Sequence, residues 1–437
     1  MFDTIRKALS IKDLRNKILF TIFIIFVVRL GSLIPIPGTD PKFFSEFFSN
    51  SDAFIPFNAI TGGSFEEMAI FALSITPYIT SSIIMQLLTI AIPKLEEWQR
   101  DGEEGRKKIV QITRYVTVGL ALIESTAMAI GFGRQGLLVH YTWYNVIVLI
   151  AILTAGSAML MWLGERITER GVGNGISIVL LVNIISRMPS DIKSLFDMFI
   201  KGKKPAFAIL AAVIVIAVIL VVIGLTVLLQ VAERRIPVQY AKKMQGRRMV
   251  GGQSSNIPLK VNTAGVIPVI FASSLLSFPI IIAQFFDPDY NTIGGKILMA
   301  LNSGSWINSS YPWYCNIGFV VYIALIIAFA YFYTSITFNP LEVADNMKKQ
   351  GGFIPGIRPG KSTSDYLKKI LNYIVFIGAV GLTIIAVIPI IVSGVFGISH
   401  ISFAGTSLII IVGVVLETIK QIESQMLVRN YKGFLND

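Results

Sequence analysis

The chain has 437 residues, of which 54% are hydrophobic and only 15% charged, and its formal net charge is +12. Soluble domains carry about 25% charged residues, so this composition predicts a membrane protein and excludes an ordinary soluble enzyme. A single cysteine, Cys315, excludes an intrachain disulfide framework and a metal site built from several cysteines. The residues before position 18 are polar and basic and do not resemble a cleavable signal peptide.

Apolar stretches long enough to cross a membrane recur along the whole chain. A helix crosses the hydrocarbon core in about 20 residues. The sequence therefore predicts an all-α polytopic membrane protein with about ten spans, at 18–36, 68–92, 110–131, 144–163, 173–188, 206–230, 264–286, 315–337, 370–393 and 400–420. The sixth span contains no charged residue and is the clearest, whereas the fifth is the shortest.

The distribution of basic residues predicts the orientation of these spans. With the N-terminus inside, most of the 38 Lys and Arg residues lie in inner segments, as the positive-inside rule requires. Both termini are therefore predicted to be cytoplasmic. A basic cluster from Arg187 to Lys204 falls on the outer side and departs from the rule. An odd number of spans in each half would make the halves 1–190 and 191–437 inverted repeats.

The second span begins unusually. Residues 58–80 read NAITGGSFEEMAIFALSITPYIT, so two glycines and two acids, Glu66 and Glu67, run into an apolar stretch that contains Pro77. Acids suit the start of a helix, and proline inside a helix removes a backbone donor and favours a kink. Broken helices are tolerated in membranes where they line a cavity. The pattern predicts a polar half-helix beside a water-filled path.

Motifs for energy conversion and catalysis were sought and not found. The sequence contains no phosphate-binding loop of the G-x-x-x-x-G-K-[ST] type, no H-E-x-x-H motif and no recognisable catalytic set. The sequence predicts neither an enzyme nor a bound cofactor or metal. Arg29 and Glu124 are the clear ionisable residues within spans and are functional candidates. A secondary transporter of small solutes, the alternative function, would usually have more buried acids.

Two inner loops carry most of the excess positive charge. They are 232–260, which contains paired arginines, and 338–369, which contains GGFIPGIRPG. Clustered arginine suits phosphate and carboxylate groups, so these loops predict a docking surface for RNA or for an acidic protein. Attraction to anionic lipids is the alternative interpretation.

Motifs along nearly the whole chain closely resemble the SecY family of bacterial protein-translocation channels. They include IPIPG (34–38), IFALSITPYITSSIIMQLL (70–88), MWLGERITERGVGNGISI (161–178), RRIPVQYAKKMQGRR (234–248), LKVNTAGVIPVIFASSLL (259–276), FNPLEVADNMKKQGGFIPGIRPG (338–360) and AGTSLII (404–410). The resemblance implies a central hourglass pore in the inner membrane of a bacterium, and it implies export of unfolded preproteins.

The resemblance also assigns roles to individual residues. It implies a plug at about 58–71, with Gly62 and Gly63 as its hinge and Glu66 and Glu67 among its polar residues. The apolar ring at the waist of the pore would consist of Ile75, Ile79, Ile176, Leu180, Ile270 and Ile410. The pairs 75/79 and 176/180 are spaced four apart, which places both members on one helix face.

A lateral gate and a docking site complete the implied channel. The gate would open between spans two and three and spans seven and eight, at the hydroxyl-bearing positions Thr80, Ser82, Ser273 and Ser274. Hydroxyls bonded to their own helix are the alternative there. The SecA motor ATPase and the ribosome would dock on Arg234, Arg235, Lys242, Arg247, Arg248 and Arg358. The resemblance further implies small SecE and SecG subunits, signal-bearing preproteins and the phospholipid bilayer as partners.

Overall fold

The protein is described by a computed structural model, which places residues 2–40, 43, 61–199, 201, 205–240, 243–245, 248–250, 254–284, 292–307, 311–396 and 406–433. Ten of its helices correspond to the ten predicted spans. They are α2 (Lys12–Leu33), α5 (Thr76–Ala91), α7 (Glu103–Gly131), α8 (Trp143–Arg170), α9 (Gly175–Phe199), α10 (Pro205–Val231), α11 (Ile267–Gln284), α13 (Asn316–Thr337), α15 (Lys361–Phe396) and α16 (Thr406–Gly433).

Shorter helices lie between the long ones. They are α1 (Phe2–Ser10), α6 (Pro93–Arg100), α12 (Ile293–Leu301) and α14 (Pro340–Lys349), with single turns at Gly133–Leu137, Ser303–Ser305 and Trp313–Cys315. In the part of the chain that the structure describes, six helices are long and apolar enough to cross a membrane by length and composition. A seventh is added if α5 and α6, which meet at a bend of 105°, form one broken span.

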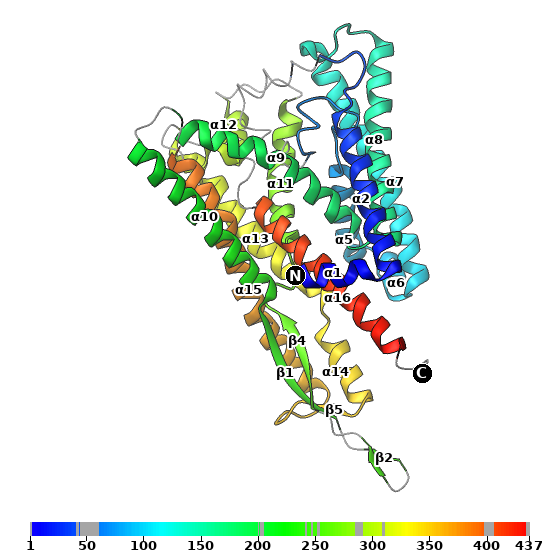
Figure 1. Cartoon of the computed structure of the whole chain (residues 1–437). Coiled ribbons are helices and arrows are strands. Elements are labelled where there is room, and N and C mark those ends of the chain that lie inside the picture. The colour runs from blue at the N-terminus through cyan, green and yellow to red at the C-terminus, as the bar shows by residue number, and fades with distance from the viewer. Residues whose placement is uncertain are drawn as a thin grey trace.

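The long helices form two packed groups that differ in chain position (Figure 1). In the first group α5 packs on α7, α7 on α8, and α2 and α9 on α8. In the second group α11 packs on α13, α13 on α15, and α10 on both α15 and α16. Contacts of α9 with α16 and with α10 join the groups. The predicted boundary between halves at 190/191 falls inside α9, so one continuous helix passes through it.

The second predicted span differs from the structure at its start. Pro77 occupies the first turn of α5, where it needs no hydrogen-bond partner and its fixed φ suits the helix. It therefore begins the helix instead of kinking it. Within the predicted plug, residues 58–60 lie outside the described residues, and 62–75 form successive turns instead of a regular helix. Positive φ angles at Met68 and Ser74, as well as at both glycines, prevent a continuous helix.

The two basic loops contain a small β structure that the all-α prediction missed. Strand β1 (Glu233–Tyr240) pairs antiparallel with β4 (Ser254–Lys260) from Glu233 to Gln239 and with β5 (Gly352–Phe353) at its end. Strands β2 (Lys243–Gln245) and β3 (Arg248–Val250) form a second hairpin. Ile236 and Val238 are buried against α14 and the start of α15. Both loops thus form one unit that projects from the helical bundle (Figure 1).

Candidate functional site

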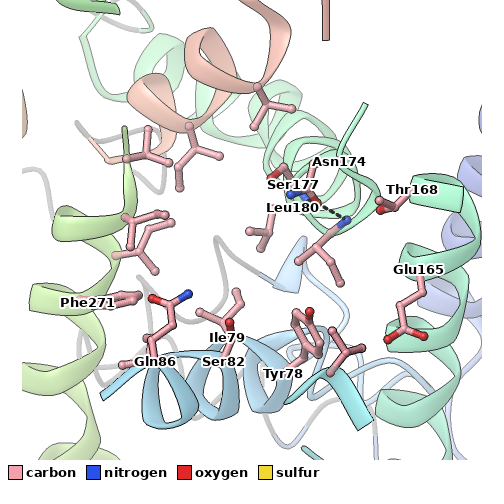
Figure 2. Close-up of a pocket in the computed structure, with 18 of the residues that line it drawn as sticks. Tyr78, Ile79, Ser82, Gln86, Glu165, Thr168, Asn174, Ser177, Leu180 and Phe271 are labelled. Atoms are coloured by element: carbon pink, nitrogen blue, oxygen red, sulfur yellow. Dashed lines mark hydrogen bonds between the residues drawn. The ribbon is translucent and has the colours of Figure 1, made fainter. Parts of the chain in front are cut away.

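A cavity of about 510 Å³ lies where the two helix groups face each other. Five of the six residues predicted to form the apolar ring line it: Ile79 from α5, Ile176 and Leu180 from α9, Ile270 from α11 and Ile410 from α16. These four helices come from distant parts of the sequence, and in Figure 2 they surround a central open space. The structure therefore brings the predicted ring together.

The sixth predicted residue, Ile75, lies beside the ring and does not line the cavity. Ile75 is the residue before α5 begins, and it is fully buried. It belongs to the same apolar cluster as Leu180 and Ile410. The Ile79 amide donates to the Ile75 carbonyl at 3.1 Å, so the two residues keep the predicted four-residue relation although Ile75 precedes the helix.

One end of the α9 wall is built by a short cap. Asn174 precedes α9, and its side-chain oxygen accepts from the amides of Ile176 at 3.1 Å and Ser177 at 3.4 Å. Such a cap satisfies amides that a helix start otherwise leaves without partners. A Cβ at Gly175 would lie 1.9 Å from the carbonyl oxygen of Gly164 on α8, so α9 can approach α8 closely only with glycine at this position. These two features fix Ile176 toward the cavity.

Polar side chains also line the cavity, and the sequence motifs did not single them out. Tyr78 and Gln86 extend from α5, and Glu165 extends from α8 (Figure 2). Glu165 accepts from Arg114 of α7 at 2.8 Å, which ties α7 to α8 at this rim. The i,i+4 spacing of Tyr78 and Gln86 about Ser82 is the sequence signal that could have identified this face of α5.

The predicted lateral-gate positions have different surroundings. Ser82 lines the cavity, whereas Thr80 and Ser274 are half-buried outside its lining. Ser273 is half-buried, and its hydroxyl donates to the Ile270 carbonyl of its own helix at 3.0 Å, as the alternative interpretation predicted. Ser81, between two predicted residues, lies near the Pro77 carbonyl of its own helix at 2.9 Å and also contacts the Thr117 hydroxyl of α7 at 2.5 Å.

Residues 61–75 contain the described part of the predicted plug (about 58–71) and are called the plug segment below; the segment packs closely against the first helix group. Its side chains Phe65, Met68 and Phe71 are buried. The segment contacts α9 through polar groups: Glu66 accepts from Arg187 at 2.8 Å, and Ser74 accepts from the side-chain amide of Asn183 at 3.0 Å. The plug segment is thus seated in the structure and held by both apolar and polar contacts.

The predicted docking residues gather on the projecting β unit where they are described. Arg234 and Arg235 are exposed on β1, and Arg235 pairs with Glu233 at 2.7 Å. Arg358 is exposed in the loop after β5. The backbone of Arg248 lies in β3, and Lys242 and Arg247 lie outside the described residues. Pairing of β5 with β1 brings the two basic loops, about a hundred residues apart, into one surface.

Comparisons with known proteins agree with this arrangement. The SecY family model matches residues 69–419. A "Protein translocase subunit SecY" of Halalkalibacterium halodurans is 42% identical, one of Streptomyces galbus 46% and one of Bacillus subtilis 42%, each over the full length of both chains.

Solved channels share the fold at lower sequence identity. "The structure of a protein conducting channel" superposes with a TM-score of 0.62 at 18% identity, covering 94% of this chain and 92% of that one. "Sec61 in the Canine ribosome-channel complex from the endoplasmic reticulum" gives 0.57 at 18% identity, with the same coverage. The chain is a multi-pass membrane protein, and it belongs to the SecY family.

Proposed function

We propose that this chain is the protein-conducting channel subunit of a protein translocase. In this proposal, unfolded preproteins cross the membrane through the cavity, and membrane-protein segments leave sideways into lipid. The observation that carries the proposal is the cavity ringed by Ile79, Ile176, Leu180, Ile270 and Ile410 at the junction of the two helix groups. Full-length relatives named as SecY translocase subunits support it.

An apolar ring suits the passage of a polypeptide. A narrow hydrophobic constriction resists wetting, so it blocks ions when empty. It also offers no hydrogen-bonding group to a sliding chain, so polar segments do not bind there. Ile and Leu side chains can rearrange around passing residues of different size, because apolar contacts are not directional.

The plug segment would close the outer side of this ring at rest. Its residues are packed and buried against the first helix group. A solved neighbour with a TM-score of 0.62 is described as a SecY protein whose plug domain stabilises the closed state and maintains a membrane seal. A passing polypeptide would displace the segment, with Gly62 and Gly63 as the hinge.

The lateral exit would lie between α5 with α7 and α11 with α13. Residues of all four helices line the cavity, whereas each pair packs within itself. Separation of the pairs would expose the cavity to lipid without breaking a helix. The two sides belong to the proposed inverted halves, 1–190 and 191–437.

The projecting β unit would receive the partner that supplies the substrate. Its exposed arginines suit phosphate and carboxylate groups. Two solved neighbours are described in ribosome complexes. We therefore propose the ribosome and the SecA motor as alternative occupants, with SecE and SecG as accompanying subunits in a bacterial inner membrane and with both termini in the cytoplasm. A solute transporter is not favoured, since the cavity ring is apolar.

Site-specific crosslinking tests the proposal. A photo-reactive residue at Ile270 should form an adduct with a secretory chain stalled halfway through export. The same probe at Ile214, which is 47% exposed on α10 outside the cavity lining, is the matched control and should not react with the stalled chain. Adducts at Ile214 with none at Ile270 would overturn the assignment of the path.

A further inference from the structure

We propose that Arg29 of α2 and Arg187 of α9 form a polar latch that holds the plug segment in place, Arg187 through its ion pair with Glu66 and Arg29 through Ser186 and the Gly62 carbonyl. The inference rests on the proposed channel function and specifies how its resting state is maintained. Both arginines lie in or beside apolar spans, where hydrophobic packing gives no reason for a charged side chain. Charged groups at such depths are costly unless they have partners.

The first half of the latch is a direct ion pair. Arg187 Nη1 lies 2.8 Å from Glu66 Oε2, and their side chains are only 23% and 30% exposed. Partial burial makes such a pair stronger than an exposed one, because water screens it less. The same arginine packs within 3.3 Å of where a Cβ at Gly63 would lie, so the contact extends to the backbone of the plug segment.

The second half reaches the plug segment from α2. Arg29 Nη1 donates to the Ser186 hydroxyl at 3.0 Å, and that hydroxyl lies 3.3 Å from the Gly62 carbonyl oxygen. The plug segment is therefore contacted from two helices: by Arg187 through Glu66, and by Arg29 through Ser186 and the Gly62 carbonyl.

This network accounts for Arg29, an arginine within an apolar helix, and for Arg187, which departs from the positive-inside rule. In both positions the arginine faces the plug segment and contributes to its closure. The latch can open, because the two arginines lie on α2 and α9 while their partners lie on or next to the plug segment. Displacement of the plug segment breaks both contacts at once, so the free energy of these contacts adds to the barrier that a substrate must overcome.

Charge reversal tests the latch. Arg187→Glu in the full-length chain, purified with its co-purifying subunits and placed in planar bilayers, should raise the resting ion conductance about tenfold, which corresponds to about 1.4 kcal/mol. Glu66→Arg should do the same. The double variant Arg187→Glu with Glu66→Arg should return the conductance toward that of the wild type, because the pair is restored with its charges exchanged.

Two further variants make the outcome decisive. Lys193→Glu reverses a charge at an exposed position of the same helix and should leave the resting conductance unchanged. Deletion of residues 62–71 should leak strongly whether or not a latch exists. A leaking deletion with a tight Arg187→Glu variant would overturn the latch and leave the channel function intact. A double variant that leaks as much as either single variant would also overturn the pairing.

If neither the deletion nor Arg187→Glu raises the conductance, the proposed channel function fails instead of the latch alone. Arg29→Gln supplies an independent readout for the second half, since it shortens the side chain and removes the charged group that donates to Ser186. We expect an intermediate rise in conductance for Arg29→Gln. Wild-type conductance in this variant would remove Arg29 from the latch.

Discussion

Single residues determine how closely the plug segment can approach its neighbours. Gly62 has a φ of +68°, and a Cβ there would lie 2.8 Å from the Asn183 Cα of α9. That distance is shorter than real Cβ contacts allow, and the atom it meets is backbone, which cannot rotate away. Gly62 is therefore required for two reasons: its left-handed backbone and the space that it leaves for α9.

We predict that Gly62→Ala prevents the plug segment from seating and raises the resting ion conductance. Gly38→Ala is the matched control, because Gly38 has a similar φ of +84° but nothing within 4 Å of its added Cβ. Both substitutions carry backbone strain of about 1–2 kcal/mol, so any excess effect at position 62 comes from the clash. Bilayer recording of both variants separates the contributions. Equal conductances would contradict the prediction.

More of the ring than of the plug segment's contacts could be predicted from the sequence. Five of the residues that the motif resemblance assigned to the ring line one cavity, because each lies on a regular helix whose face follows from spacing. Ile75 was displaced because it precedes the helix. The partners of Glu66 and of Ser74 could not be predicted, since they lie more than a hundred positions away on α9. Local pattern contains no information on such pairings.

Proline determines where helix α5 begins. A proline in the first turn costs no hydrogen bond, whereas one in a helix interior removes a donor. Pro77 belongs to the first case, and Pro279 within α11 to the second. Sequence alone could not separate the two, because both prolines stand within long apolar runs.

We predict that Pro77→Ala lowers thermal stability by about 1 kcal/mol or less, through greater freedom of the unfolded chain. The path of α5 should be unchanged, so the crosslinking pattern from Ile79 should match that of the wild type. Pro279→Ala is the comparison, since it restores a backbone donor inside α11 and is expected to stabilise that helix. Thermal unfolding with crosslinking from Ile79 and Ile270 checks both variants. A shifted pattern for Pro77→Ala would show that Pro77 bends the chain after all.

The proposed docking surface depends on how the strands pair. Arg234 and Arg235 lie on a strand whose neighbours are fixed by β pairing, so their removal changes charge without changing the fold. The sequence predicted the charge of this surface but missed the strands, because positively charged turns and Gly or Pro residues masked their alternation of buried and exposed positions.

We predict that Arg234→Glu with Arg235→Glu weakens ribosome binding and makes it less sensitive to salt. The slope of log affinity against log salt should become shallower by about 0.7–0.9 for each phosphate that the variant no longer neutralises. Arg134→Glu is the control, because Arg134 lies after α7, away from the β unit. Binding measured at several salt concentrations distinguishes the variants. An unchanged slope in the double variant would show that these arginines bind no phosphate.

The long helices form two groups, and the cavity lies between them. Hydropathy predicted ten spans, and ten helices of the described residues correspond to them in order, six or seven of which are long and apolar enough to cross a membrane. The span count suggested two inverted halves, but which helices surround the pore was predicted only through family resemblance, since hydropathy does not tell which helices are neighbours.

We predict that a covalent crosslink across the cavity, between the two helix groups, stops export and the release of membrane segments. Gln86→Cys on α5 with Phe271→Cys on α11, in a Cys315→Ser background, places thiols on two walls of the same cavity. A short cleavable crosslinker should abolish both export and the release of membrane segments, and reduction should restore them. The control pair Ser82→Cys with Gln86→Cys lies on one helix, and its crosslinking should have no effect. Export that continues with α5 and α11 joined would contradict separation of the groups.

The attachment of the β unit has a mechanical consequence. Strand β1 begins two residues after α10 ends, and the Val261 amide after β4 donates to the Ala232 carbonyl at 2.9 Å, which closes the base of the hairpin. A few residues beyond that base, α11 begins and carries Ile270 into the cavity wall. The base of the hairpin is therefore connected to the cavity wall by only a few residues. A docked partner that tilted the tip would exert torque on that wall without entering the membrane.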